Sequence, residues 1–94
     1  MEVKEYLKSI GINQSGQEGK QGSYIIDLAN SDEYGRVFSK LERAEDLEIL
    51  QDNQVITEQG SSLMYESETK PYLLNLIADF DGDKYQLIVN EIGD

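Results

Sequence analysis

The chain has 94 residues, lacks cysteine, histidine and tryptophan, and carries a formal net charge of −11 from 19 acidic and 8 basic residues. The missing cysteines exclude a disulfide framework and a thiolate metal site. The charge disfavours direct binding to nucleic acid or to an anionic membrane, because both depend on lysine and arginine to neutralise phosphate, and it favours a basic partner.

An amphipathic helix is predicted over residues 1–11. Within residues 2–10, apolar side chains recur at the i, i+3, i+4, i+7 spacing of one helical face, and a glycine ends the pattern: Val3, Tyr6, Leu7, Ile10 and Gly11. So short a helix is unstable alone. We therefore expect its stripe to pack on the sheet of its own domain, and the alternative is that it packs on a partner.

Residues 12–22 are predicted to form a flexible loop. From residue 13 onward the segment has no apolar side chain, and it contains three glycines, Gly16, Gly19 and Gly22. The alternative is a glycine-rich phosphate cradle. The glycine spacing matches neither GxGxxG nor GxxxxGK[ST], so the sequence argues against that cradle.

Short strands are predicted through the middle of the chain. Residues 23–29 and 35–41 form a predicted hairpin around the turn-forming residues 30–33. Leucines and an alanine at helical spacing leave a helix over residues 40–50 as an alternative. Two further strands, residues 55–58 and 62–66, flank Gln59 and Gly60.

The last segment, residues 72–92, predicts an antiparallel hairpin with a type I′ turn at Asp81-Gly82. This turn sets Asp79 opposite Lys84 and Leu76 opposite Leu87. One side of the hairpin is then apolar and forms the core face: Leu74, Leu76, Ala78, Phe80, Tyr85, Leu87 and Val89.

The predicted fold class is therefore α+β. It comprises the N-terminal amphipathic helix and an antiparallel β-meander of five or six strands within residues 23–92, ending in the type I′ hairpin. At this length residues 1–94 form one domain with one core. No apolar run is long enough for a signal peptide or a membrane span, so we expect a cytoplasmic protein.

Negative charge is concentrated in the middle of the chain. Residues 42–68 hold eight carboxylates against Arg43 alone, and Tyr34 lies beside further carboxylates. Proteins usually intersperse charges of opposite sign, so the sequence predicts a surface that binds a basic partner. The alternative is a solvated loop and edge surface, with Tyr34 half-buried. The predicted partner-binding residues are Glu42, Glu45, Asp46, Glu48, Asp52, Glu58, Glu66, Glu68 and Tyr34.

No metal, cofactor or catalytic site is predicted. Asp79, Asp81 and Asp83 have the i, i+2, i+4 spacing found in calcium loops, but the glycine and the bidentate glutamate of an EF-hand are not at their required positions. The turn explains Asp81 and Gly82 instead. Without histidine or cysteine, acid–base chemistry would need carboxylates paired in a cleft, and no pattern indicates one.

Three functional hypotheses follow. The first is a non-enzymatic, acidic protein-binding domain, in its sharpest form a small inhibitor or immunity-type protein that engages a basic nucleic-acid-binding partner. The second is an assembly module that forms homo-oligomers through a sheet edge or the N-terminal helix. The third is a small calcium-dependent module.

Overall fold

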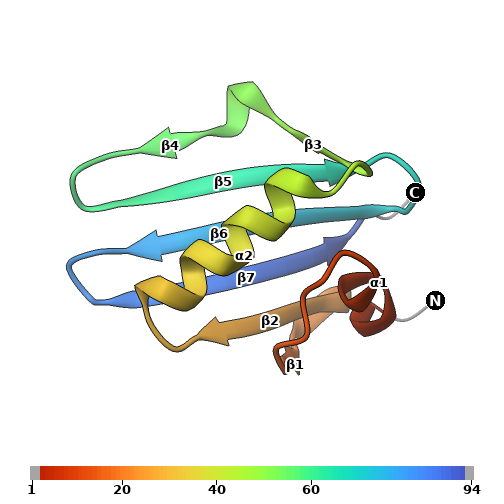
Figure 1. Cartoon of the computed structure of the whole chain (residues 1–94), viewed down its shortest axis with the longest axis horizontal. Helices are drawn as coiled ribbons and strands as arrows, with labels where there is room; N and C mark the ends of the chain where they lie inside the picture. Colours follow the sequence, from red (N-terminus) through yellow and green to blue (C-terminus); the bar gives the residue numbers. More distant parts are fainter. Residues whose placement is uncertain (1–2, 93–94) are drawn as a thin grey trace.

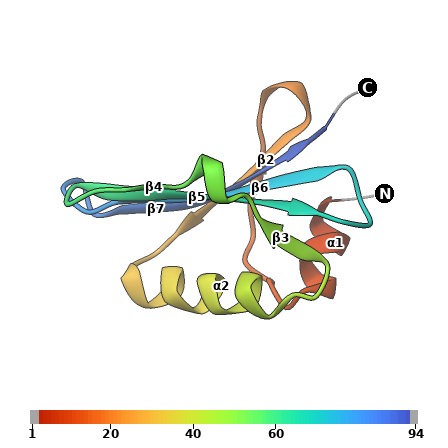
Figure 2. The ribbon, with the colours of Figure 1, turned by 90° about the horizontal axis from the view of Figure 1, so that it is seen from above.

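Antiparallel strands form one sheet, and both α-helices lie on the same face of it (Figures 1 and 2). The computed structural model describes residues 3–92, except for the side chain of Gln21. Within this range the elements are α1 (Val3–Ser9), β1 (Gln17–Glu18), the 3-10 helix η1 (Lys20–Gly22), β2 (Ser23–Leu28), α2 (Ser31–Arg43), β3 (Leu47–Ile49), the 3-10 helix η2 (Gln51–Asn53), β4 (Val55–Ile56), β5 (Gly60–Ser67), β6 (Tyr72–Asp79) and β7 (Lys84–Glu91). The predicted α+β class is confirmed. The predicted meander holds only from β4 to β7, because β2 pairs with β7 and the next strand in the chain, β3, lies at the opposite edge of the sheet.

The C-terminal hairpin is the centre of the sheet. Its strands occupy adjacent positions in the order β1-β2-β7-β6-β5-β3, and β4 pairs with β5 beside β3. The predicted register is confirmed, with Asp79 opposite Lys84 and Leu76 opposite Leu87. Alternate residues of β6 and β7 are buried beneath the helices, as the predicted core face requires.

The turn of this hairpin differs from the prediction. A type I′ turn needs positive φ at both central residues. Here Asp83 alone of the loop residues has positive φ, at 50°, and Asp79 Oδ1 accepts a hydrogen bond of 3.1 Å from the Gly82 N–H. The chain therefore turns over the four residues between Asp79 and Lys84. Phe80, predicted in the core, lies in this loop with 49% of its surface exposed.

The N-terminal helix packs on its own sheet, as predicted. Tyr6 and Leu7 of α1 are buried, and the Tyr6 ring lies 5.2 Å from the Tyr72 ring of β6, centroid to centroid. Residues 1 and 2, with which the predicted helix begins, lie outside the described residues. The apolar stripe of α1 is thus used inside the domain.

The strand predicted over residues 35–41 is wrong, because Ser31–Arg43 forms helix α2. Asn30 caps the helix by accepting a hydrogen bond of 2.9 Å from the Glu33 N–H, and Glu33 in turn accepts one of 3.0 Å from the Ala29 N–H. Val37 and Leu41 then face the sheet and are buried. The alternative helix over residues 40–50 is also wrong beyond Arg43, since β3 follows at Leu47.

Two segments differ in detail from expectation. The predicted flexible loop contains β1, which pairs with β2, and the turn η1. The sheet has seven described strands where five or six were predicted, because β1 and β3 were not predicted, while the strand predicted over residues 35–41 is part of α2. The strands predicted over residues 55–58 and 62–66 correspond to β4 and β5.

The second face of the sheet is covered by neither helix (Figure 2). Half-buried apolar side chains project from its strands, and we call this surface the open face: Ile25, Met64, Leu73, Ile77 and Ile88. Polar side chains are interspersed among them, such as Asn75, which lies opposite both Met64 and Ile88.

Candidate functional site

Charge is divided between the layers of the fold. The helices α1 and α2 together carry five basic and four acidic residues and are therefore close to neutral. The described strands carry six acidic residues and one basic residue, Lys84. The net negative charge thus belongs to the sheet and its connections. A basic partner would meet its strongest attraction there and not at the outer surface of the helices.

The structure does not gather the predicted carboxylates into one patch. They follow the edge formed by β3, η2 and β4 and continue around the end of α2. Glu42 lies on α2, Asp52 on η2 and Glu58 between β4 and β5, whereas Glu45, Asp46 and Glu68 lie in the connections at the opposite end of β5. Only Glu48 and Glu66 are direct neighbours, on β3 and β5.

Glu48 and Glu66 lie directly opposite each other on adjacent strands, and both are exposed. Like charges in this arrangement destabilise a sheet. Between Arg43 and Lys70 the sequence contains no lysine or arginine to neutralise them. A cation from another molecule would relieve this repulsion, so the pair is the part of the predicted surface best suited to a basic partner.

Asp46 has a structural role. Its carboxylate accepts hydrogen bonds from the Tyr6 hydroxyl at 2.7 Å, from the Ser67 hydroxyl, and from the Thr69 N–H at 2.9 Å. Partial burial opposes its ionisation, but the bonds from Ser67, Tyr6 and Thr69 outweigh this and lower the pKa of Asp46 to about 2. Asp46 therefore joins α1 to the turn between β5 and β6.

Replacing Asp46 by asparagine is expected to lower the free energy of unfolding by about 2 kcal/mol, because an amide presents donors where three donors already point and loses the charge that strengthens their bonds. The melting temperature should fall by roughly 10 °C. Glu45→Gln is the matched control, since Glu45 is adjacent and exposed. An equal effect of the two substitutions would contradict the structural role of Asp46.

The same pair of proteins gives a pH test. Because the pKa of Asp46 is lower in the folded chain than the ordinary value of about 4, its contribution is complete above that value and is lost as pH falls toward about 2. The difference in unfolding free energy between wild type and Asp46→Asn should thus be constant at neutral pH and shrink between about pH 4 and pH 2. Urea titrations across this range measure it, and a gap that persists unchanged at the acid end would refute the assignment.

Glu42 and Tyr34 also make contacts within the fold. The Tyr65 hydroxyl donates to Glu42 at 2.6 Å, and burial together with this bond raises the pKa of Tyr65. The Tyr34 ring packs 5.5 Å from the Tyr85 ring, and its hydroxyl lies 3.2 Å from the Ser61 hydroxyl. Tyr34 is therefore half-buried on α2, in agreement with the alternative considered from the sequence.

A second acidic surface lies where two hairpin loops meet. The Phe80 N–H donates to the Gln59 carbonyl at 2.8 Å, which joins the β4–β5 loop to the β6–β7 loop. We call residues 55–60 and 79–84 the acidic tip. This end of the sheet projects beyond the first turn of α2, so the helix covers neither of its faces (Figures 1 and 2). It contains four carboxylates and Lys84: Glu58, Asp79, Asp81 and Asp83.

The acidic tip also exposes apolar side chains. Val55, Ile56 and Phe80 have 56%, 73% and 49% of their surface accessible, and they are the three most exposed large apolar side chains of residues 3–92. Apolar groups surrounded by charge are typical of protein-binding surfaces. The sequence prediction included Glu58 but missed the rest of this tip. The signal was present in the sequence. In an antiparallel meander, two turns that are separated by one other turn must lie at the same end of the sheet, and the β4–β5 and β6–β7 loops are separated only by the β5–β6 turn.

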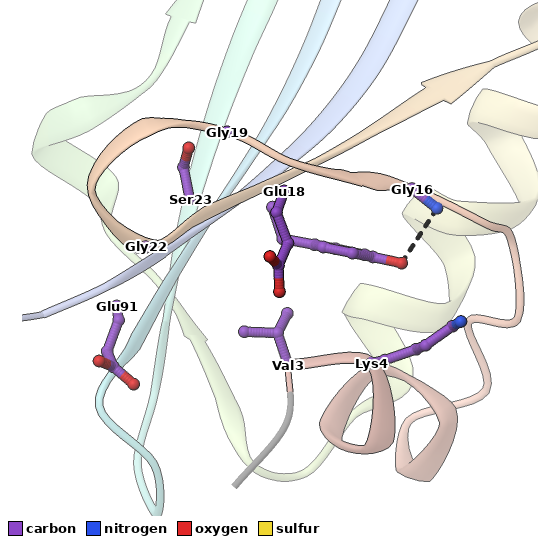
Figure 3. Close-up of a pocket in the computed structure, with 9 residues that line it drawn as sticks. Val3, Lys4, Gly16, Glu18, Gly19, Gly22, Ser23 and Glu91 are labelled. Atoms are coloured by element: carbon purple, nitrogen blue, oxygen red, sulfur yellow. Dashed lines mark hydrogen bonds between the residues drawn. The ribbon is translucent and has the colours of Figure 1, made fainter.

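The glycine-rich segment surrounds a hollow beside α1 (Figure 3). The Gly16 N–H donates to the Tyr24 hydroxyl at 3.0 Å, and a side chain at Gly16 would come within 2.7 Å of the Ile25 carbonyl oxygen. Glu18 and Glu91 line the hollow, with Lys4 as the basic residue. The close approach of the hairpin explains the need for glycine at position 16, and the two carboxylates repel phosphate.

No described residues form a metal centre: within residues 3–92, no three histidine, cysteine, aspartate or glutamate side chains are arranged to hold an ion. Asp79 instead accepts the bond from Gly82 that shapes the loop. Of the described helices, none is both long and apolar enough to cross a membrane.

No family model, curated protein or solved structure matches this chain. The acidic tip and the Glu48–Glu66 pair are therefore the features from which function can be inferred.

Proposed function

We propose that this protein is a non-enzymatic protein-binding domain whose acidic surface engages a basic partner. The observation that carries the proposal is the acidic tip, where Val55, Ile56 and Phe80 are exposed among four carboxylates. Exposed apolar groups supply affinity in protein interfaces, and the surrounding charge supplies orientation and a fast association rate. A small ligand would need a concave site, whereas the acidic tip is the projecting end of the sheet (Figure 1).

In its sharpest form the protein is an inhibitor or immunity-type protein of a nucleic-acid-binding enzyme. The carboxylates of the sheet and its loops would then occupy a groove lined with lysine and arginine, in the positions that phosphates take in the nucleic acid. The near-neutral helices would face away from the groove. A cytoplasmic location belongs to this proposal, and fractionation of the native cells tests it.

The test is capture of the partner from a nuclease-treated native lysate on the immobilised protein, followed by stepwise salt elution. The captured protein is purified, and its affinity is measured for three variants of equal charge. The tip variant neutralises three carboxylates of the acidic tip (Glu58→Gln, Asp81→Asn, Asp83→Asn). The strand-pair variant neutralises the Glu48–Glu66 pair and its neighbour (Glu48→Gln, Glu66→Gln, Glu68→Gln). The control variant neutralises exposed carboxylates around the hollow and on α1 (Glu5→Gln, Glu18→Gln, Glu91→Gln).

We expect the tip variant to lose at least about tenfold in affinity at low salt, and the control around the hollow to lose less than about threefold. Asp79 is left intact because its carboxylate shapes the loop. The strand-pair variant reports whether the surface predicted from the sequence also contributes. Equal losses in all three variants would show that only net charge matters, and an affinity insensitive to salt would contradict the proposal.

The alternative function is self-association through a sheet edge, for which β4 offers the exposed side chains of Val55 and Ile56. The response to salt separates the two. Two copies of a chain with net charge −11 repel each other, so a homo-oligomer should become more stable as salt screens that repulsion, whereas binding of a basic partner should weaken. Sedimentation at low and high salt measures this directly.

A further inference from the structure

Strand β4 has one unpaired edge. Among residues 3–92 it pairs only with β5, through Val55 opposite Ser62 and Ile56 opposite Ser61, and it lies off the main path of the sheet. The next residue, Thr57, donates its N–H to the Gly60 carbonyl at 2.8 Å. Along an antiparallel strand, the backbone N–H and carbonyl groups of one residue bond to the partner strand, and those of the next residue point away from it. The N–H and carbonyl of Ile56 therefore point away from β5, toward the free edge.

The side chains of β4 are also available. Val55 projects on the side of the open face and Ile56 on the side of the helices, because their partners Ser62 and Ser61 lie on those two sides. With 56% and 73% of their surface exposed, neither is covered by the fold. Edge strands are usually protected from pairing by lysine, proline or a bulge. Here the protection is limited to the short length of the strand and to the negative charge around it.

That charge determines which strand can be added. Asp52 and Glu58 flank β4, and no lysine or arginine lies between Arg43 and Lys70. A second copy paired antiparallel along β4 would bring Asp52 of each copy toward Glu58 of the other, which is unfavourable. A basic segment would place its cations against them. The charge of this edge thus selects against self-pairing and in favour of a basic strand.

We propose that β4 is a site of strand addition, which accepts an extended, lysine- or arginine-containing segment of the partner along its free edge. The backbone groups of Ile56 would bond to the added segment, Val55 and Ile56 would contact its apolar side chains on the two faces, and Asp52 and Glu58 would pair with its cations. This inference rests on the proposed function and names the type of partner segment that the tip receives.

The test uses the full chain, labelled with nitrogen-15, and a short synthetic peptide with a central run of valines flanked by lysines at both ends, so that apolar side chains lie on both faces of the added strand. A control peptide has proline in place of every second valine and cannot form a strand. We expect the first peptide to shift the amide signals around Ile56 and to slow hydrogen exchange of the Ile56 N–H. The proline peptide should do neither, and salt should weaken the binding.

The protein variants separate backbone from side-chain effects. Ile56→Pro removes the outward N–H of residue 56 but leaves the bond from the Thr57 N–H to Gly60. It should weaken binding of the peptide by at least about tenfold. Ile56→Thr keeps the N–H and should weaken binding of the peptide by about threefold. Thermal melting verifies that both variants are folded. If Ile56→Pro does not fold, the exchange measurement on the wild-type chain decides alone.

The possible results are distinguishable. Binding of both peptides would overturn strand addition and leave the proposed function intact, if the amide signals of many acidic residues shift and hydrogen exchange of the Ile56 N–H is not slowed. If neither peptide binds at low salt, the result would contradict both strand addition and the proposed function. Slowing of Ile56 exchange by increasing protein concentration and salt alone would identify a second copy as the occupant and overturn the proposal.

Discussion

Gly60→Ala is expected to lower the free energy of unfolding by about 3 kcal/mol. A Cβ atom at Gly60 would overlap the backbone carbonyl oxygen of Ala78, in the strand opposite. Because Gly60 pairs with Asp79 in the β5–β6 ladder, neither backbone can move without loss of hydrogen bonds at the base of the acidic tip. The melting temperature should fall by more than about 10 °C, and calorimetry or urea denaturation checks it.

Gly35→Ala is the matched control and should have the opposite sign. Gly35 lies inside α2, and a Cβ there meets no atom within 4 Å. The substitution reduces the conformational freedom of the unfolded chain, so it should stabilise the protein by about 0.5–1 kcal/mol. A destabilised Gly35→Ala variant would show that this face of α2 is in contact with another molecule, and a neutral Gly60→Ala would contradict the tight approach of β5 to β6.

Leu87→Ala is expected to cost about 3 kcal/mol or more, which is a large part of the stability of a small domain. Leu87 is completely buried and lies between Leu76 of β6 and Ile26 of β2, which are also completely buried. Its truncation leaves a cavity that neighbouring strands cannot close. Equilibrium unfolding in urea measures the effect.

The neighbouring substitution Ile88→Ala tests which face of the sheet is covered. Ile88 is half-buried on the open face, so its truncation should cost about 1 kcal/mol, clearly less than that of Leu87. A loss as large as that of Leu87→Ala would mean that the open face is buried against something in solution. Repeating the measurement at several protein concentrations would then identify a second copy as the cover.

The hairpin of β6 and β7 shows what local pattern can predict. Its register was predicted correctly because a shift of one residue would move Leu74, Leu76, Leu87 and Val89 to the solvent side. The turn type was not, since alternation in the strands determines which residues pair but not how the loop between them is closed. Phe80 was misplaced for the same reason: the alternation ends at Asp79, where the ladder ends.

Helix α2 shows where local pattern is ambiguous. Within residues 35–41, Val37 and Leu41 fit an alternating strand, but with Tyr34 they equally fit the buried side of a helix. The cap formed by Asn30 and Glu33 was the deciding local signal, and the prediction treated those residues as a turn. The core face of the sheet needs a helix to cover it, and the spacing of apolar residues along the sequence does not reveal this need.

The sequence prediction included three carboxylates of the candidate site, Glu48, Glu58 and Glu66, but none of its exposed apolar side chains. Composition indicated an acidic surface, but Asp46 and Glu42 proved to hold the fold together through Tyr6 and Tyr65. The acidic tip joins residues from two hairpins that are separated by about twenty positions in the chain, and a search for charge along the sequence does not connect them. Strand pairing brings them together.

By itself, the sequence determined the α+β class, the packing of α1 within the domain, the register of the central hairpin and the excess of negative charge. These depend on periodicity and composition, which are local properties of the chain. Only the tertiary structure decided which carboxylates are structural, that α2 covers one face, and that Val55, Ile56 and Phe80 are exposed beside Glu58. Those properties depend on which distant segments lie side by side, because burial and electrostatic environment are set by neighbours in space and not by neighbours in sequence.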